Sequence, residues 1–462
     1  MASSTGLIGR HIEALLDEKS FVETGSRITA RSTDFVTDPI KSPSDGVITG
    51  YGTIEGRRVY IYAQDASVLG GSIGEMHAKK ICGIYDLAVK TGSPVIGLID
   101  STGLRLQEST DALNGLGEIY YKQSMAKGVV PQICAVFGNC GGGLALFSAM
   151  ADFTFMEEKD GKLFVNSPDA VDGNYTAKND TSSAKFQTEE SGNADVAGSA
   201  DDIIAGMRKL VSMLPQNNED VAVDECSDDL NRILPGIEGA AGDTSILLSQ
   251  VADDNDFFEL GASYAKDMIT GFIKLDGITV GCVANRSEIV GDDGKAVKLS
   301  GRMSHKGAYK ASDFVDFCDL FGIPVLAVVN TQGFEASMCS ERHMAKAAAA
   351  LMDSFANCDV PRITLIVGKA YGSAYVIMNS KGIGADMVFA WPDAQIGPMD
   401  AKLAGKIMCG DKGAAEADKY AKSFAELQNN ASSAAARGYV DEVIDPQDTR
   451  KHLVYAVEML FE

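Results

Sequence analysis

Two stretches of the chain are alike: AKKICGIYDLAVKTGSPVIGLIDSTG at residues 78–103 and AYKASDFVDFCDLFGIPVLAVVNTQG at residues 308–333. A constant shift of 230 residues aligns them, and the same shift continues downstream. The residues that coincide are Lys80 with Lys310, Asp86 with Asp316, Gly92 with Gly322, Pro94 with Pro324, Gly103 with Gly333, Pro131 with Pro361, Gly138 with Gly368 and Gly142 with Gly372. A register this long indicates a duplicated domain.

A second alignment extends the repeat upstream. The segment IEGRRVYIYAQ at 54–64 matches LDGITVGCVAN at 275–285 with a shift of 221 residues. The two shifts differ by nine residues (230 − 221). The polar segment GDDGKAVKLSG at 291–301 accounts for this difference as an insertion in the second copy.

Both copies follow the same order of patterns. A β-rich stretch leads into a helix that ends at Gly92 or Gly322. Next comes an apolar run, PVIGLID or PVLAVVN, which is typical of a strand covered on both faces. After a second helix, the strand PQICAVFG or PRITLIVG runs into a turn of small residues that opens another helix. This alternation predicts an α/β fold.

The region between the copies, 157–245, is less regular. The Ser- and Gly-rich residues 182–202 are expected to form a surface loop, and the apolar spacing over 201–215 predicts an amphipathic helix. We place the domain boundary near Gly242, which gives an N-terminal domain at 1–242 and a C-terminal domain at 243–462.

Composition and charge limit the possible functions. A net charge of −23 argues against nucleic-acid binding, because phosphate backbones favour Lys and Arg. A polyanionic ligand would need a local basic cluster. The candidates are Arg57, Arg58, Lys79, Lys80 and Arg105. Nine cysteines without a C-x-x-C pair argue against a disulfide framework and a zinc ribbon.

Two segments bear on targeting. The first residues, MASSTGLIGRHIEALLDEKS, lack a basic region followed by an apolar stretch, so we expect no signal peptide. Residues 129–151 are uncharged over a length that could span a bilayer, but they include Pro131, Asn139 and three consecutive glycines. We therefore interpret this segment as a buried strand, a glycine turn and a helix.

The glycine turns are the best candidates for chemistry. Residues 141–143 (GGG) and the equivalent 371–375 (YGSAY) each stand where a strand enters a helix. Such a turn leaves backbone N–H groups unpaired at the positive end of the helix dipole, and it can bind an oxyanion. No nucleophile elbow, zinc-protease motif, P-loop or dinucleotide fingerprint is present in the sequence. The five histidines show no metal-ligand spacing, so no metal site is expected.

Further motifs support a family resemblance. They are GVITGYGTIEGRRVYIYAQDASVLGGSIGEMHAKKI (46–81), VIGLIDSTGLRLQE (95–108), GNCGGGLALFSAMADFTFM (138–156), GKAYGSAYVIMNSK (368–381), AWPDAQIGP (390–398) and ARGYVDEVIDP (436–446). With these motifs the chain resembles the carboxyltransferase subunits of biotin-dependent acyl-CoA carboxylases. It also resembles the α subunits of methylmalonyl-CoA and glutaconyl-CoA decarboxylases. The resemblance implies two duplicated crotonase-like domains built as ββα spirals.

The resemblance also implies roles for individual residues. Acyl-CoA would lie in the first half, with its thioester carbonyl held by Gly142, Gly143 and Leu144. Biotin would lie in the second half, with its ureido oxygen held by Gly372, Ser373 and Ala374. Further substrate contacts would come from Gly70, Gly71, Arg105 and Val376. The reaction would move a carboxyl group between carboxybiotin and a short-chain acyl-CoA, either acetyl-CoA and propionyl-CoA to malonyl-CoA and methylmalonyl-CoA or the reverse.

Partners follow from motifs that the sequence lacks. There is no A-M-K-M biotinylation site and no ATP-binding motif. The resemblance therefore implies a biotin carboxyl carrier protein together with a biotin carboxylase or a membrane sodium-pump decarboxylase subunit. It also implies a homo-oligomer, a dimer or a trimer of dimers. The expected location is cytoplasmic, with a partner-mediated attachment to the membrane in the decarboxylase case.

The sequence departs from the family pattern at several positions. The usual A-G-G-A turn is GGGL at 141–144, and the second turn has Ser373 where glycine is usual. Val376 replaces an aspartate that many members carry, which leaves the acyl substrate open. The segment NTQGFEAS at 330–337 replaces the usual D-V-P-G-F-x-P-G.

Two other functions stay open at this point. A crotonase-type hydratase or isomerase would need a carboxylate base, for which Glu75, Glu108 and Glu335 are candidates. A catalytically silent scaffold subunit would be consistent with Ser373 and the altered residues 330–337.

Overall fold

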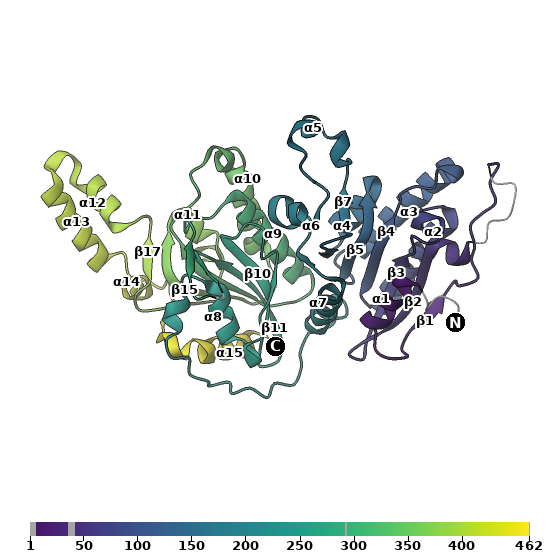
Figure 1. Ribbon diagram of the computed structural model, residues 1–462. Coiled ribbons are helices and arrows are strands. Elements are labelled where there is room, and N and C mark those ends of the chain that lie inside the picture. The colour runs from purple at the N-terminus through teal and green to yellow at the C-terminus, as the bar shows by residue number, and fades with distance from the viewer. Residues whose placement is uncertain (1–5, 36–41, 292, 462) are drawn as a thin grey trace. The chain divides into compact units, whose positions relative to one another are not determined.

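The chain forms two compact units, Met1–Val221 and Ala222–Glu462 (Figure 1). The computed structural model describes residues 6–35, 42–291 and 293–461. Over these residues each unit is built on an eight-stranded sheet. The α/β class predicted from the alternating patterns is confirmed.

The first unit contains strands β1 (Val22–Thr24), β2 (Val47–Ile54), β3 (Arg57–Gln64), β4 (Val95–Ser101), β5 (Gln132–Gly141), β6 (Phe153–Glu157), β7 (Lys162–Phe164) and β8 (Val196–Gly198). The sheet order is β1-β2-β3-β4-β5-β6-β8, and β7 also pairs with β5. The first three strands are antiparallel, and from β3 onward the strands are parallel. Its main helices are α1 (Leu7–Leu15), α2 (Glu75–Thr91), α3 (Ser109–Ala126), α4 (Ala145–Met150) and α7 (Ala200–Met213).

The second unit repeats this plan. Its strands are β9 (Phe258–Leu260), β10 (Met268–Leu275), β11 (Ile278–Asn285), β14 (Val325–Thr331), β15 (Arg362–Tyr371), β16 (Met387–Ala390), β17 (Gln395–Gly397) and β18 (Glu442–Val443). Their order is β9-β10-β11-β14-β15-β16-β18, with β17 paired to β15. The two sheets are therefore equivalent strand by strand, and the duplication is confirmed.

The helices of the second unit are α8 (Thr244–Val251), α9 (His305–Leu320), α10 (Met338–Asn357), α11 (Gly372–Val376), α12 (Ala401–Cys409), α13 (Ala414–Leu427), α14 (Ala431–Ala436) and α15 (Thr449–Leu460). Within this unit α12 and α13 form a hairpin that extends away from the sheet (Figure 1). The insertion predicted near 291–301 lies at a separate ribbon of β12 (Glu288–Val290) and β13 (Ala296–Lys298).

A pair of equivalent lysines shows how closely the two units correspond. The Lys80 ammonium on α2 donates to the carbonyls of Ser44, at 3.0 Å, and Val47. The Lys310 ammonium on α9 donates to the carbonyls of Gly261 at 2.7 Å and Met268 at 2.8 Å. Val47 is the first residue of β2, and Met268 is the first residue of β10. Each lysine therefore joins a helix to the start of the equivalent strand in its own unit.

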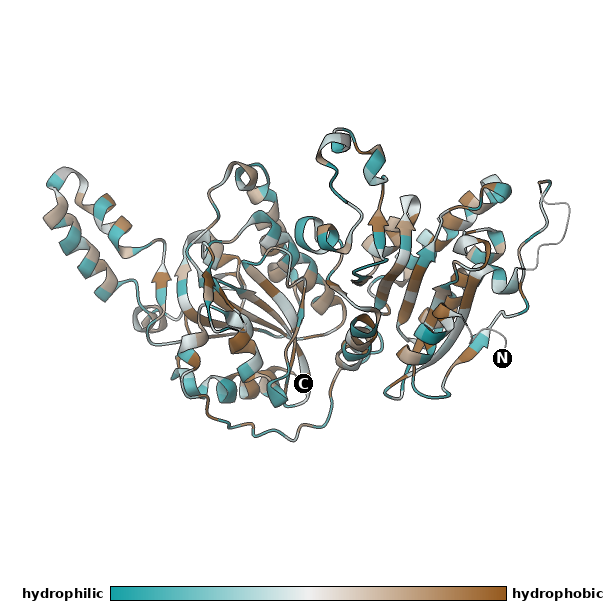
Figure 2. Ribbon diagram, in the orientation of Figure 1, coloured by the Kyte–Doolittle hydropathy of each residue, from teal (hydrophilic) through white to brown (hydrophobic). Residues whose placement is uncertain are grey.

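The core of each unit lies between its sheet and its helices. In β4 and β14 the residues 95–99 and 325–329 are all buried, as expected for strands covered on both faces. Figure 2 shows the hydrophobic residues gathered along the central strands, with hydrophilic residues on the outer sides of the helices. The uncharged segment 129–151 forms β5, a glycine turn and α4, as predicted. No described helix is long and apolar enough to cross a membrane.

The region between the copies is more ordered than its composition suggested. Residues 182–202 contain the short helix α6 (Ala184–Phe186) and the edge strand β8, so the prediction of a plain surface loop is wrong. The Gln187 side chain is buried and donates to the carbonyls of Leu163 at 2.9 Å and Thr181 at 2.7 Å. The hydrogen bond to Leu163 attaches the segment to β7. The predicted amphipathic helix is α7, which begins with a capping box of Ser199 and Asp202.

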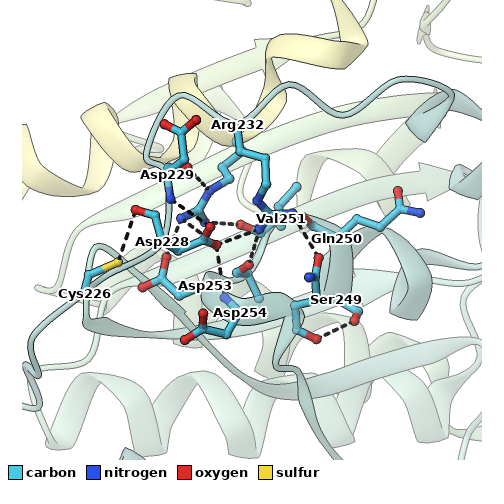
Figure 3. A network of polar contacts seen from close by, with 12 residues as sticks. Cys226, Asp228, Asp229, Arg232, Ser249, Gln250, Val251, Asp253 and Asp254 are labelled. Carbon is cyan, nitrogen blue, oxygen red and sulfur yellow. Dashed lines mark hydrogen bonds and ion pairs between the residues drawn. The ribbon is translucent and has the colours of Figure 1, made fainter.

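A polar network attaches residues 222–242 to the second unit (Figure 3). Arg450 of α15 is fully buried; it donates to the Val251 carbonyl at 2.6 Å and pairs with Asp253 at 2.7 Å. Arg232 pairs with Asp228 at 2.9 Å and donates to the carbonyl of Gln250 at 3.1 Å. These contacts explain why the units part at Val221, upstream of Gly242.

Candidate functional site

The first glycine turn joins β5 to α4. Gly142 has φ +64°, a left-handed conformation that L side chains rarely adopt. A Cβ at Gly141 would stand 2.5 Å from the Phe164 ring. Both glycines are therefore required by the backbone and by the packing of the turn.

This turn forms part of the wall of a cavity of about 620 Å³. The cavity is lined by Ile73, Ser101, Thr102, Gly103, Leu104, Leu106, Leu116, Asn139, Gly141, Gly142, Gly143, Leu144, Phe164 and Val165. The first N–H groups of a helix have no acceptor within it, so the N–H groups of residues 142–144 are available to a ligand. An apolar pocket with backbone donors on one wall suits an acyl group that carries a carbonyl.

The second glycine turn joins β15 to α11 in the same way. Gly372 has φ +62°, close to the value at Gly142. Ala374 is fully buried, whereas Ser373 is exposed and Val376 is 41% exposed. The two turns that the sequence predicted thus share a left-handed glycine at the equivalent position, although the first continues as a 3-10 helix and the second as an α-helix.

A cavity of about 640 Å³ lies beside the second turn. Its lining residues are Gly372, Ser373, Tyr375, Val376, Ser380, Lys381, Gly382, Ile396, Gly397, Pro398, Phe424, Gln428, Ala434, Arg437 and Tyr439. The wall therefore combines apolar side chains with two cations, Lys381 and Arg437. The hairpin helix α13 and the helix α14, which have no counterpart at the first cavity, close one side of it.

Asp100 and Asn330 accept a hydrogen bond from the backbone just before each glycine turn. The sequence patterns did not single out these two residues. The Asn139 N–H donates to Asp100 Oδ1 at 3.1 Å, and the equivalent Lys369 N–H donates to Asn330 Oδ1 at 3.1 Å. A Cβ at Gly138 would stand 2.1 Å from Asp100 Oδ1, which explains why this position is glycine in both copies. Burial raises the pKa of Asp100. The 230-residue shift, which aligns Asp100 with Asn330, was the available signal.

Gly70 and Gly71 pack against residues 100–102, two of which line the first cavity. Both have positive φ, and a Cβ at Gly71 would stand 2.3 Å from the carbonyl oxygen of Asp100. The Thr102 N–H donates to the Gly70 carbonyl at 2.9 Å. Neither glycine is among the described residues that line the cavity. They lie against the end of β4, and their close contact with it fixes the position of the loop 69–74.

Arg105 lies in a buried polar cluster. Its guanidinium pairs with Asp45 at 2.7 Å and Glu108 at 2.8 Å, and it donates to the Ser72 carbonyl at 2.7 Å. It is not among the described residues that line the cavity. These contacts fix the segment 101–108, which supplies one cavity wall.

Four of the five cations considered for a polyanion site are engaged by groups of the protein itself. Arg57 donates to the carbonyls of Val211 and Leu214, both at 2.7 Å, at the end of α7. Lys80 and Arg105 are buried in the contacts described above. Arg58 and Lys79 are exposed, and Lys79 pairs with Glu75 at 2.7 Å.

The three candidate carboxylate bases have other partners. Glu75 pairs with Lys79 and with Arg31 at 2.8 Å, and the hydrogen bond from Lys79 lowers its pKa. Glu108 is buried and accepts from the Glu75 N–H at 2.6 Å. Glu335 accepts from the Ser340 hydroxyl. Over the described residues, no group of three His, Cys, Asp or Glu side chains is arranged to hold a metal ion.

Comparison with known proteins gives the family. The model of the carboxyl transferase domain matches residues 5–462. The chain belongs to the carboxyl transferase family. The match covers both units, which agrees with the duplication seen in the sequence and in the sheets.

Relatives of known function match over almost the whole chain. A propionyl-CoA carboxylase beta chain of Roseobacter denitrificans is 41% identical, with 97% of this chain and 89% of that protein covered. A methylmalonyl-CoA decarboxylase subunit alpha of Propionigenium modestum is 37% identical, with 96% and 88% covered. The crystal structure of transcarboxylase 12S with hydrolysed methylmalonyl-coenzyme A bound has a TM-score of 0.90 and 34% identity, with 98% and 89% covered. The crotonase-like carboxyltransferase fold implied by the resemblance is confirmed.

Proposed function

We propose that this chain transfers a carboxyl group between carboxybiotin on a carrier protein and a short-chain acyl-CoA. The observation that carries the proposal is a pair of equivalent glycine turns, each on the wall of its own cavity. The chain that contains them is 41% identical to a propionyl-CoA carboxylase beta chain. A hydratase or isomerase is less well supported, since Glu75, Glu108 and Glu335 are engaged by other side chains or backbone.

The first cavity is the proposed acyl-CoA site. The N–H groups of Gly142, Gly143 and Leu144 would hold the thioester carbonyl oxygen. Negative charge develops on this oxygen when the acyl α-carbon becomes a nucleophile. One well-aimed donor contributes about 3–4 kcal/mol to such a transition state. The apolar side chains of Ile73 and Leu116 would exclude water from the acyl chain.

The second cavity is the proposed biotin site, and its residues suit the group. Its wall offers apolar side chains for a ring. Of its two cations, Lys381 pairs with Asp441 at 2.8 Å and Arg437 donates to Gln428 Oε1 at 2.9 Å, so the backbone turn is the main support for this site. The N–H groups of Gly372, Ser373 and Ala374 would hold the ureido oxygen. Bound biotin supplies the ureido nitrogen that carries the carboxyl group. Val376 also lines this cavity. It is the proposed contact for an acyl substrate that would be held by the first half of another chain.

The proposal includes partners. The relatives comprise carboxylase beta chains and decarboxylase alpha subunits, so the direction of reaction would depend on the partner: a biotin carboxylase or a membrane sodium-pump subunit. A biotin carboxyl carrier protein would deliver the biotin. Transcarboxylase 12S is described as a hexamer, which supports an oligomer, either a dimer or a trimer of dimers. We propose a cytoplasmic location, with membrane attachment only through a partner.

The test is a transfer assay with the purified chain. Methylmalonyl-CoA or malonyl-CoA is supplied with free biotin, and loss of the carboxylated thioester is followed by chromatography. We expect biotin-dependent transfer, no ATP hydrolysis and no signal on an avidin blot. Covalent biotin, ATP turnover, or hydration of crotonyl-CoA without any carboxyl transfer would contradict the proposal.

A further inference from the structure

Tyr120 contacts the backbone of the first glycine turn. This residue lies on α3, one helical turn after Leu116, which lines the cavity. Its hydroxyl donates to the carbonyl oxygen of Gly143 at 2.6 Å. Its ring packs edge-on against Phe147 of α4 with 5.8 Å between ring centroids. The side chain thus reaches from α3 to the turn and to the helix that follows it.

The bonded carbonyl belongs to the same peptide unit as the Leu144 N–H. A trans peptide is planar, and its N–H points opposite to its C=O. Fixing the Gly143 carbonyl therefore fixes the direction of the Leu144 N–H, away from Tyr120. A hydrogen bond to a peptide carbonyl also polarises the peptide and strengthens its N–H as a donor. Burial raises the pKa of Tyr120, so the hydroxyl keeps its proton at neutral pH.

The sequence of the turn is adapted to this contact. A Cβ at Gly143 would stand 2.8 Å from the Tyr120 hydroxyl oxygen, closer than Cβ contacts normally allow. The second unit differs, because the residues equivalent to Gly143 and Tyr120 under the 230-residue shift are Ser373 and Ala350. A side chain at position 373 is compatible with the absence of a tyrosine at position 350. The contact is therefore particular to the first unit.

We propose that Tyr120 is a positioning residue for acyl-CoA chemistry, which it serves by aiming the Leu144 N–H at the thioester oxygen. The inference rests on the function proposed for the first cavity. Tyr120 is not among the described residues that line the cavity, so it would act through the turn and not by direct contact with the substrate. Its effect is greatest in the transition state, when charge develops on that oxygen, and small in the bound ground state.

The experiment compares Tyr120→Phe with Tyr121→Phe in the carboxyl transfer assay. Tyr121 is the neighbouring tyrosine on α3 and is 63% exposed, so its substitution is a matched control. Complete loss of an oxyanion donor costs about 10²–10³ in kcat, and a misdirected donor keeps part of its effect. We expect Tyr120→Phe to lower kcat about tenfold, with the KM for methylmalonyl-CoA and the KM for biotin unchanged. Tyr121→Phe should match the wild type.

A second variant separates the hydroxyl from the packing of the ring. Tyr120→Leu removes both, and its kcat per folded molecule should fall at least as far as that of Tyr120→Phe. Full kcat in Tyr120→Phe, with or without a loss in Tyr120→Leu, would overturn the inference, as would a change confined to KM. Failure of the wild type and Tyr121→Phe to transfer any carboxyl group would instead refute the proposed function.

Discussion

At the scale of single residues, Glu108 and Glu75 stand at the same end of α2 in different surroundings. Glu108 is buried between the Arg105 guanidinium and the Glu75 N–H. The Glu75 side chain is partly exposed and pairs with Lys79 and Arg31. The sequence offered both as candidate bases, but the structure gives Glu108 a role in holding the cavity wall.

Replacing these carboxylates should separate stability from catalysis. We expect Glu108→Gln to lower the free energy of unfolding by about 1–3 kcal/mol, because it weakens a buried charged contact. Glu75→Gln should change it by less than about 1 kcal/mol. Both variants should keep most of their kcat, measured per folded molecule. A thousandfold loss of kcat at unchanged stability in either variant would favour a side-chain base.

The buried His77 should make stability depend on pH. Its Nδ1–H donates to the Asp45 carbonyl at 2.9 Å, so its Nε2 accepts from the Gln64 amide at 3.2 Å. Burial lowers the pKa of His77 from 6.5 to about 3. Between these values the unfolded chain binds the proton and the folded chain does not, so stability falls as the pH falls.

The measurement is urea unfolding of the wild type and His77→Gln. The wild type should lose up to about 1.4 kcal/mol per pH unit more than the variant from pH 6 to pH 5. Above pH 7.5 the free energy of unfolding should change with pH equally in the two proteins, because His77 is neutral in both the folded and the unfolded chain there. Equal slopes over the acidic range would show that His77 is not buried in its neutral form.

At the scale of elements, each unit uses a lysine to join a helix to the second strand of its sheet. Lys80 joins α2 to β2, and Lys310 joins α9 to β10. Backbone carbonyls at a strand start lack a ladder partner on one side, and the ammonium group supplies it. The alignment of the two lysines in the sequence reflects this shared contact.

Removal of the second lysine tests the contact. Lys310→Met keeps the length of the side chain and removes its donors, so we expect a loss of about 1–3 kcal/mol in the free energy of unfolding. The exposed Lys346→Met on α10 is a matched control that should be near neutral. Equal stability of the two variants would contradict a structural role for Lys310.

At the scale of the whole molecule, the two units share their sheets and turns and differ in the walls of their cavities. The first cavity is closed by residues 101–104, Leu106 and Leu116, and the second by the helices α13 and α14. Under the proposed function, two units with equivalent turns bind different ligands because the walls of their cavities differ. The family resemblance implies that the first half of one chain works with the second half of another.

Mixed oligomers test this arrangement. Gly143→Pro and Ala374→Pro each remove a backbone N–H from one turn, so each variant alone should be inactive. Chains with different tags are co-expressed, and doubly tagged oligomers are purified. A mixed dimer holds one intact site, so it should recover roughly half of the wild-type activity.

The control is the thermal melt of each variant, which must match the wild type before activities are compared. Inactive mixed dimers that are well folded would show that each active site lies within a single chain.

Sequence patterns were sufficient to predict the duplication, the α/β class and the two glycine turns. Periodicity and register are local properties, so the order of apolar residues and glycines was enough to assign residues 129–151 to a strand, a turn and a helix. Glycine at 142 and 372 could be recognised because a left-handed backbone demands it.

The polar side chains available to a ligand could be identified only from the folded chain. Arg105 could have been a surface cation, but folding places it beside Asp45, 60 positions earlier in the chain (105 − 45). Tyr120 could not be selected, because its contact with Gly143 depends on how α3 packs against α4. The partner of a buried polar group is set by chain segments that meet only in the folded core, and no local pattern of residues records that meeting.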